Sequence, residues 1–378
     1  MTVAASADTA IRAVRAAVYV VPTTFDGEPV RESDGTAEWD STTVLVVEVD
    51  AGGRTGLGYA YTSSTALGLV KDVLAPALTG CDAFATTQAF WNMARAVRNI
   101  GWRGIAASAI SAVDVALHDL KAKLLDVSLL GLLGAGRDRI MVYGSGGFTS
   151  YSDEQLEQQL SGWAERGIRA VKMKIGTDAA ADPGRVRAAR AAIGDEVQLF
   201  VDANGAYSRK QALGMAARFS AEAGVTWFEE PVSSDDLDGL RLIRDRGPAG
   251  MQIAAGEYGY VPADFRMLLT AGAVDTLQAD ATRCGGVTGF LNAAQQCVAW
   301  SVPLSAHCAP ALHATLAAAA EPAVHVEYFH DHTLIESMLF DGVPELVGGC
   351  LVPDQSRSGL GLQLSGRGDD YRKESWGA

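Results

Sequence analysis

The chain contains 378 residues, of which 48% are apolar and 20% are charged, proportions typical of a globular enzyme. Its formal net charge of −14 argues against a nucleic-acid partner, because phosphate binding requires a basic surface, but it leaves room for an anionic small molecule in a locally positive pocket. No apolar run is long enough to cross a bilayer, so we expect no membrane partner.

The first third of the chain predicts a small α+β domain, which we assign to residues 1–132. Its opening residues, MTVAASADTA, lack the basic start and apolar core of a signal peptide. Strand patterns at 11–21, at 43–50 and in AGGRTGLGYAY come first. Helical patterns follow at about 64–78, 86–97 and 104–124. A meander of strands followed by a run of helices is typical of one α+β unit.

A polar segment rich in Gly, Pro and Asp, residues 22–40, separates the first two strands. Loops of this length inside a compact domain are either functional or disordered. The sequence leaves both alternatives open.

From about residue 140 short apolar strands alternate strictly with amphipathic helices. The strand candidates begin with IMVYGSG, AVKMKIG and VQLFVDANG and end with LSAHCAP and VHVEYF. Eight such strands with intervening helices indicate a (β/α)₈ barrel, to which we assign residues 133–350. The remaining residues, 351–378, predict a return segment that packs on the first domain.

Three successive barrel strands are predicted to end in a carboxylate, at Asp202, Glu229 and Glu257. Catalytic residues of such barrels lie at the carboxyl ends of strands, so these acids should converge, and they would repel one another strongly unless neutralised. Carboxylate oxygens without Cys or His beside them suit Mg²⁺ or Mn²⁺ better than Zn²⁺. The alternative is that these residues are unrelated surface acids at the starts of loops. It could account for any one of them, but it accounts poorly for all three together at this spacing.

Ionisable residues also end the other strands. Lys172 and Lys174 alternate along one strand and so face the same side, where crowding and burial would lower a lysine pKa and create a base. Asp280 and His307 follow two later strands, where a carboxylate can orient an imidazole as a second acid/base. Solvated lysines and a structural histidine are the alternatives. Together these groups predict a pocket with an acid/base on each side of a metal.

The motifs KMKIG, FVDANG, WFEEP, AAGE, QADATRCGGVTG and SAHCAP jointly resemble the enolase superfamily and, within it, the mandelate racemase family. The resemblance extends over nearly the whole chain. It implies an α/β fold in which a (β/α)₇β-type TIM barrel carries an N-terminal α+β capping domain.

The resemblance also implies roles for individual residues. Glu327 is expected to act as an acid that donates a hydrogen bond to the enolate oxygen of the substrate. The family pattern assigns the metal ligands to Asp202, Glu229 and Glu257, the two acid/bases to Lys174 and to His307 with Asp280, contacts with the substrate carboxylate to Lys172 and Glu327, and supporting positions to Asn204 and Glu230.

The sixth barrel strand separates this chain from other branches of the superfamily. Muconate-lactonising enzymes and dipeptide epimerases carry a lysine there, whereas residues 266–300 contain none. Asp280 and Arg283 occupy this stretch instead, which favours His307 with Asp280, and not a lysine, as the second acid/base. Arg283 is then interpreted as a surface residue or as a neighbour of the ligands.

The family encloses its substrate with the loop at residues 22–40. The polarity of this loop favours a polyhydroxylated ligand over an aromatic hydroxy acid. The last strand is followed by His330, Asp331 and His332. The two histidines either contact the substrate or have a structural role. The candidate substrate contacts in these two segments are Asp26, Trp39 and His330.

The five cysteines are scattered, odd in number and free of any CxxC pair. Reduced thiols in the cytoplasm are therefore expected rather than a disulfide framework. They are Cys81, Cys284, Cys297, Cys308 and Cys350.

These expectations describe an enzyme that uses Mg²⁺ to abstract the proton α to a substrate carboxylate through a stabilised enediolate. The leading hypothesis is a hydro-lyase that dehydrates an aldonate or aldarate sugar acid to a 2-keto-3-deoxy acid. A cycloisomerase of a sugar lactone or anhydro sugar acid and a racemase or epimerase of a 2-hydroxy acid are the enzymatic alternatives. A non-catalytic sugar-acid binding protein is the alternative outside enzymes. The resemblance further implies a homo-oligomer, either a dimer or an octamer.

Overall fold

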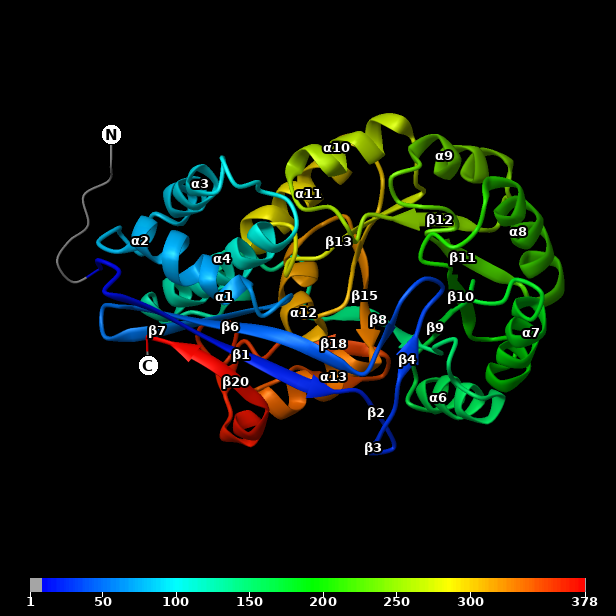
Figure 1. Cartoon of the computed structure of the whole chain (residues 1–378), viewed down its shortest axis with the longest axis horizontal. Coiled ribbons are helices and arrows are strands. Elements are labelled where there is room, and N and C mark those ends of the chain that lie inside the picture. The colour runs from blue at the N-terminus through cyan, green and yellow to red at the C-terminus, as the bar shows by residue number, and fades with distance from the viewer. Residues whose placement is uncertain (1–8, 378) are drawn as a thin grey trace.

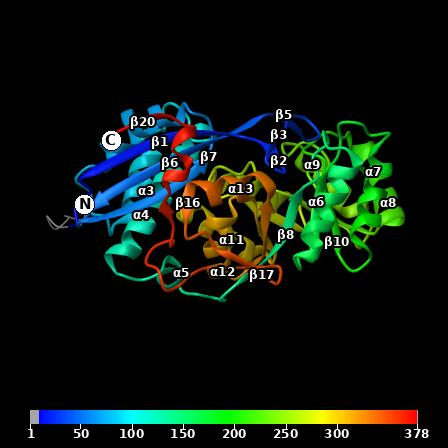
Figure 2. The ribbon, with the colours of Figure 1, turned by 90° about the horizontal axis from the view of Figure 1, so that it is seen from below.

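The computed structural model describes residues 9–377 and shows a β/α barrel with a smaller sheet-and-helix domain at its side (Figure 1). Figure 2, turned by 90°, shows the blue strands of the smaller domain at one end and the green barrel helices at the other. The expected absence of a signal peptide rests on the first ten residues, of which 1–8 lie outside the described part. Within 9–377, no helix combines the length and the apolar character that a membrane crossing requires.

The smaller domain is built on a four-stranded antiparallel sheet with the order β20-β1-β6-β7. Buried side chains alternate along β1, as expected for a sheet with one covered face. Helix α4 (Ile105–Leu124) covers that face and is buried almost all round, because the barrel helix α11 (Gly286–Trp300) packs on its other side. The strands are β1 (Ala13–Pro22), β6 (Ser41–Ala51), β7 (Arg54–Tyr61) and β20 (Arg372–Trp376).

Two features fix α4 between sheet and barrel. Gly58 of β7 lets the helix approach the strand, since a Cβ there would lie 2.1 Å from the carbonyl oxygen of Ala112. On the opposite side, the Asp114 carboxylate accepts hydrogen bonds from the backbone N–H of Thr288 at 2.9 Å and from its hydroxyl at 2.8 Å. The smaller domain is therefore held directly against the barrel.

The helix predicted at 64–78 is divided in three. It consists of α1 (Ala66–Leu69), a π-helical turn at Val70–Leu74 and α2 (Ala75–Leu78). Pro76 lacks the N–H that would bond to the carbonyl group four residues earlier, which disfavours a continuous α-helix here. The next predicted helix is present as α3 (Thr86–Ala96).

Residues 22–40 form two small hairpins and not a disordered loop. Thr149, after the first barrel strand, donates its N–H to the carbonyl of Ser33 at 2.8 Å, and the Thr177 hydroxyl donates to the carbonyl of Asp34 at 2.7 Å. The segment is thereby tied to the rim of the barrel. The paired strands are β2 (Thr24–Phe25) with β3 (Glu28–Pro29), and β4 (Glu32–Ser33) with β5 (Glu38–Trp39).

Within the described residues, eight parallel strands close into a barrel through pairing of the last with the first. Seven helices alternate with them, which confirms the predicted (β/α)₇β arrangement. The strands are β8 (Ile140–Gly146), β9 (Ala170–Lys174), β10 (Gln198–Asp202), β11 (Val225–Glu229), β12 (Gln252–Ala255), β13 (Thr276–Ala279), β14 (Leu304–Ala306) and β15 (Ala323–Phe329). The intervening helices are α6 (Asp153–Glu165), α7 (Asp182–Ile193), α8 (Arg209–Ala223), α9 (Leu237–Arg246), α10 (Pro262–Ala271), α11 and α12 (Pro310–Ala319).

The register of the strands arranges the barrel interior in layers. Lys174 pairs with Asp202, and Asp202 pairs with Glu229, so the ends of three strands lie at one level. Two residues earlier, Phe200 and Trp227 stack with ring centres 5.2 Å apart. Because side chains alternate along a strand, this aromatic layer forms the floor beneath the polar strand ends.

After the barrel the chain forms α13 (His330–Leu339) and then a hairpin whose second strand, β18 (Cys350–Val352), pairs with β8. It then returns to the first domain, where β20 pairs with β1. The domain boundaries at residues 132 and 350 stay predictions.

Candidate active site

The polar residues at the strand ends meet inside the barrel mouth. Asp202, Glu229 and Glu257 are 0%, 0% and 3% exposed, and each offers a carboxylate oxygen within 4.8 Å of the others. The backbone turns sharply after two of them, because Asn204 and Glu230 have positive φ angles of 45° and 37°. These turns let consecutive strands aim their acids at one point.

The electrostatics of this cluster fit a hard divalent cation. Burial and the neighbouring charge of Asp202 raise the pKa of Glu229 to about 8. In the part of the chain that is described, Glu257 Oε2 is buried and accepts no hydrogen bond. A bound cation would neutralise the repulsion and satisfy this oxygen, and three carboxylates are a donor set that Mg²⁺ prefers.

The two lysines project into the same space from β9. Lys172 is fully buried, with Nζ 2.5 Å from Glu229 Oε1 and 2.8 Å from Glu327 Oε1. Lys174 Nζ donates to Asp202 Oδ2 at 2.5 Å. Burial lowers the pKa of Lys174, but the charge of Asp202 outweighs it and raises that pKa, contrary to the depression expected from the sequence. The acids that surround the two lysines come from other strands, and their charge reverses the effect expected from the lysine pair alone.

His307 faces the lysines from the other side of the barrel, at the end of β14. Its Nδ1 lies 3.0 Å from Asp280 Oδ2, while Nε2 points into the site, 3.2 Å from Glu257 Oε2. Burial disfavours the Asp280 anion, yet its hydrogen bond with His307 holds the pKa of this carboxyl below its usual range. Asp280 thereby fixes Nδ1 as the protonated nitrogen and leaves Nε2 for proton transfer.

Glu327 is held as an anion and not as the expected acid. Ser145 donates its hydroxyl to Oε1 at 2.6 Å, and the Cys308 N–H donates to Oε2 at 2.9 Å. Burial opposes ionisation, but the Lys172 charge outweighs it and lowers the pKa of Glu327. The contacts from Ser145, Cys308 and Lys172 are all donors, so this carboxylate accepts hydrogen bonds in the structure.

Three supporting candidates lie beside the cluster. Asn204 donates its backbone N–H to Asp202 Oδ1 at 2.9 Å. Glu230 is 1% exposed, and burial and the charge of Glu257 raise its pKa well above the usual range, which favours its neutral form. Arg283 donates to the Glu257 carbonyl oxygen at 3.2 Å and lies against the Tyr258 ring, so it braces a ligand.

The other three candidates lie outside the cluster. Asp26 is exposed and accepts a hydrogen bond from Gln158 Nε2 at 2.8 Å. His330 lies with Nε2 3.0 Å from the Thr24 carbonyl oxygen, so it holds the hairpin segment. Trp39 donates from Nε1 to Asp331 Oδ2 at 3.3 Å.

An apolar cluster connects the hairpins with the edge of the site at Cys308, whose Sγ lies 3.4 Å from His307 Nε2. Trp39 packs edge-on against Phe148 with ring centres 5.4 Å apart. The polar side chains of the segment are divided, because Glu28 and Arg31 are exposed whereas Glu32 is buried. The aromatic wall, as we call it, consists of Phe148, Tyr151, Cys308 and Phe329 with Phe25, Val30 and Trp39 packed against them.

Two family models together match most of the chain. The mandelate racemase / muconate lactonizing enzyme N-terminal domain matches residues 15–134, and the enolase C-terminal domain-like model matches residues 155–368. The protein belongs to the mandelate racemase/muconate lactonizing enzyme family.

Individual members of this family resemble the chain over most of its length. A 3,6-anhydro-alpha-L-galactonate cycloisomerase from Streptomyces coelicolor is 34% identical over 79% of this chain and 82% of its own. A mandelate racemase/muconate lactonizing enzyme-like protein from Rubrobacter xylanophilus is 49% identical, with a TM-score of 0.93 over 96% of this chain and 100% of its own. An L-talarate dehydratase from Polaromonas sp. JS666, complexed with Mg and L-glucarate, is 33% identical, with a TM-score of 0.87 over 97% and 98%.

Two residues that the sequence analysis missed complete the cluster of this family member. Ser145, the second-last residue of β8, donates its hydroxyl to Glu327, and Trp227 donates from Nε1 to Glu229 Oε2 at 3.0 Å. Trp227 lies two positions before Glu229, and side chains two positions apart on a strand face the same side. This spacing was a signal in the sequence that could have identified Trp227. Ser145 carried no comparable signal, because its role depends on the neighbouring strand β15.

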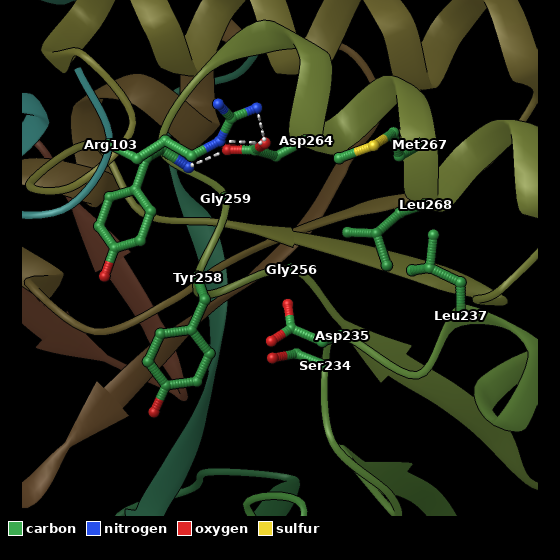
Figure 3. Close-up of a pocket in the computed structure, with 11 residues that line it drawn as sticks. Arg103, Ser234, Asp235, Leu237, Gly256, Tyr258, Gly259, Asp264, Met267 and Leu268 are labelled. Atoms are coloured by element: carbon green, nitrogen blue, oxygen red, sulfur yellow. Dashed lines mark hydrogen bonds and ion pairs between the residues drawn. The ribbon is translucent and has the colours of Figure 1, made fainter. Parts of the chain in front are cut away.

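A cavity of about 630 Å³ lies next to the end of β12 (Figure 3). Its lining includes Gly256 and Tyr258, on either side of Glu257, and reaches Arg103, which is ion-paired with Asp264 at 2.7 Å. None of the lysines or metal-type carboxylates lines it. The cavity is therefore distinct from the cluster in the barrel mouth.

Proposed function

We propose that this protein is a metal-dependent enzyme that removes the proton α to a substrate carboxylate, and that it dehydrates a sugar acid to a 2-keto-3-deoxy acid. The observation that carries the proposal is the placement of Lys174 and His307 on strands β9 and β14, on opposite sides of three buried carboxylates. A protein that only binds a sugar acid has no need of two opposed acid/bases.

Asp202, Glu229 and Glu257 would hold Mg²⁺, with Mn²⁺ as the alternative ion. When bound, such a cation neutralises negative charge that develops on the substrate carboxylate. The complex of the Polaromonas dehydratase with Mg supports this choice of ion.

Three residues of the chain would bind the substrate carboxylate, remove the α-proton and protonate the leaving group. Lys172, anchored by Glu229 and Glu327, presents a fixed positive charge to the substrate carboxylate. Lys174, in its neutral form, takes the α-proton onto Nζ, and a cation held by Asp202 would favour that form by offsetting the carboxylate charge that raises the lysine pKa. His307 then gives the proton on Nε2 to the departing β-hydroxyl group, which leaves as water, and the resulting enol becomes the 2-keto acid. Proton count and charge balance over these steps.

Relatives of both reaction types support the wider class. The Streptomyces relative is a cycloisomerase and the Polaromonas relative a dehydratase, so lyase and isomerase chemistry both occur at similar sites. We place dehydration first, because it uses His307 as an acid and Lys174 as a base in one direction.

A second candidate, racemisation or epimerisation of a 2-hydroxy acid, is favoured by the placement of Lys174 and His307 on different sides of the carboxylate cluster. Two bases on opposite faces of one carbon are what racemisation requires. The aromatic wall adjoins the site at Cys308, which is consistent with an apolar substituent.

Incubating the protein with Mg²⁺ and a panel of sugar acids and apolar 2-hydroxy acids in deuterated water tests the proposal. Dehydration predicts a 2-keto product, and racemisation predicts inversion with deuterium at the α-carbon. Neither product nor α-deuterium with any acid, from protein that binds Mg²⁺, would contradict the enzymatic proposal. A cytoplasmic location and a dimeric or octameric state complete the proposal, and light scattering tests the latter.

A further inference from the structure

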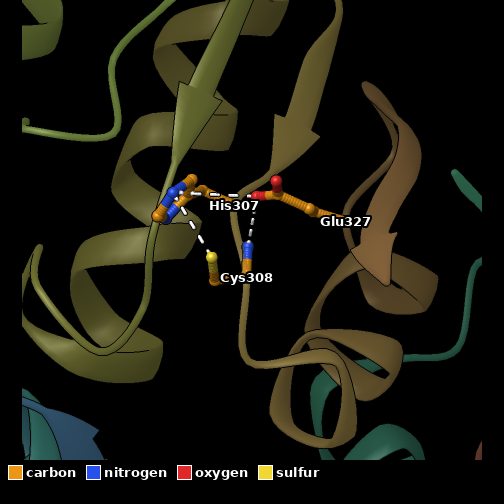
Figure 4. A group of neighbouring side chains, drawn as sticks. All are labelled: His307, Cys308 and Glu327. Carbon is orange, nitrogen blue, oxygen red and sulfur yellow. Dashed lines mark hydrogen bonds and ion pairs between the residues drawn. The ribbon is translucent and has the colours of Figure 1, made fainter. Parts of the chain in front are cut away.

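A second group of metal-type donor atoms lies beside the three carboxylates. His307 Nε2 is 3.4 Å from Cys308 Sγ and 3.7 Å from Glu327 Oε2, and all three atoms lie within 4.8 Å of one another (Figure 4). The three side chains are buried. We propose that His307, Cys308 and Glu327 form a separate inhibitory site for a thiophilic divalent cation of the Zn²⁺ type.

The donor set distinguishes this group from the carboxylate cluster. Sulfur, imidazole nitrogen and carboxylate oxygen are the ligands that Zn²⁺ takes in proteins, whereas Mg²⁺ avoids thiolates. Zinc–ligand bonds of about 2.0–2.3 Å at tetrahedral angles place neighbouring donor atoms about 3.4–3.6 Å apart. The distances from His307 Nε2 to Cys308 Sγ and to Glu327 Oε2 nearly match this spacing without any movement of the chain.

The supporting contacts already have the form of a metal site. The Nδ1 atom of His307 is bonded to Asp280 Oδ2, so Nε2 is the nitrogen free to bind an ion. Glu327 receives the Ser145 hydroxyl on Oε1, while Oε2 faces His307. Carboxylates and hydroxyls that orient ligands in this way strengthen metal binding.

Glu257 of the carboxylate cluster lies next to this group. Its Oε2 atom is buried and lies 3.2 Å from His307 Nε2. This oxygen offers a fourth donor. Glu257 also belongs to the Asp202–Glu229–Glu257 cluster. A cation bound by His307, Cys308 and Glu327 would therefore interfere with the carboxylate cluster as well as with His307.

Filling the site changes the proton inventory of the pocket. Cys308 must release its thiol proton and His307 must release any proton on Nε2 to bind the cation, and these protons pass to solvent. His307 Nε2, once bound to the ion, can neither accept nor donate a proton. This inhibitory consequence rests on the proposed function, whereas binding of the ion does not.

The test uses Co²⁺ as a spectroscopic probe for Zn²⁺ on the full chain, with Mg²⁺ in large excess to occupy the hard site. We expect a thiolate-to-cobalt charge-transfer band in the near ultraviolet that added Zn²⁺ abolishes. Cys308→Ser should remove the band and weaken Zn²⁺ binding at least about tenfold, the lower limit seen even for loss of a supporting group. Cys297→Ser, another buried cysteine, should keep both.

No charge-transfer band in the wild-type protein would overturn the proposal without reference to any variant. Equal Zn²⁺ affinity of the wild type and a folded Cys308→Ser would also overturn it, since the ion would then lie among the carboxylates. Neither measurement needs turnover, so their failure would leave the proposed reaction untouched.

Discussion

The hydrogen bond between His307 Nδ1 and Asp280 Oδ2 determines which nitrogen of the imidazole takes part in chemistry. Asp280 has its own supports, because the N–H of Thr282 donates to Oδ1 at 2.7 Å and Arg283 Nε lies 3.6 Å from Oδ2. A carboxylate so held is a fixed acceptor. It keeps the proton on Nδ1 and directs Nε2 toward substrate.

Changing Asp280 to Asn should therefore impair proton transfer and leave metal binding intact. An amide can present its NH₂ group to Nδ1 and stabilise the wrong tautomer, and general acid–base catalysis contributes about 10²–10⁴-fold. We expect a fall in kcat of that size with a small change in KM. Asp275→Asn, at the opposite end of the same strand, is the matched control. Equal kcat values for the two variants would refute the role of Asp280.

At the scale of elements, the hairpins of residues 22–40 are fastened to the barrel by a buried pair of acids. Glu32 of β4 is 0% exposed and lies against Asp331 at the start of α13. Tyr151 donates its hydroxyl to Glu32 Oε1 at 2.8 Å, Trp39 donates to Asp331, and His330 is adjacent. Burial, then the Asp331 charge, raises the pKa of Glu32 to about 10, so the pair shares a proton at neutral pH.

Docking of the hairpins should consequently weaken as pH rises. The docked form keeps its proton up to a pKa of about 10, whereas a free glutamate loses it near 4.5, so docking stability falls through the window between these values. The protection of residues 22–40 against hydrogen exchange, relative to the intrinsic rate of an unfolded chain at the same pH, should therefore fall toward the alkaline end of the window. Glu32→Gln should remove this fall, and Glu38→Gln, exposed on the same hairpins, should not. A wild-type protection factor that does not change with pH would contradict the account.

The approach of α4 to β7 gives a second prediction for the elements. A methyl group at Gly58 would meet the Ala112 carbonyl oxygen at 2.1 Å, so helix or strand would have to move. Gly58→Ala should lower the free energy of unfolding by about 1–3 kcal/mol in urea denaturation. Gly68→Ala, where a Cβ would meet nothing within 4 Å, should be neutral or stabilising. Similar loss in both variants would show that the close contact is not the cause.

Over the whole molecule, the alternation of strand and helix patterns in the sequence was sufficient to predict the barrel and the residues at the ends of its strands. One β/α unit separates Asp202, Glu229 and Glu257, and the parallel register follows from that spacing. Properties set by several distant segments at once could not be predicted. The raised pKa of Lys174, the ionised state of Glu327 and the aromatic wall each depend on neighbours from other strands or from the hairpins.

Binding of Mg²⁺ to Asp202, Glu229 and Glu257 should raise the free energy of unfolding of the whole chain. A cation that binds only the folded chain adds about 2.7 kcal/mol at a concentration of 100 times its Kd. We therefore expect Mg²⁺ to raise the Tm of protein treated with a chelator. Glu229→Gln should reduce this rise, whereas Glu345→Gln, an exposed residue below the barrel, should not. A Tm that is insensitive to Mg²⁺ in the wild type would argue against the cation site.

The central claim is that Lys174 removes the α-proton of a sugar acid and His307 protonates its departing β-hydroxyl group. Its most direct test measures α-proton exchange with deuterated water and formation of the 2-keto product from a turned-over acid, in Lys174→Ala and His307→Asn. The account predicts that Lys174→Ala loses both by at least about 10²-fold, whereas His307→Asn loses product formation by a similar factor and keeps α-proton exchange. Product formation at the wild-type rate in either folded, Mg²⁺-binding variant would contradict it.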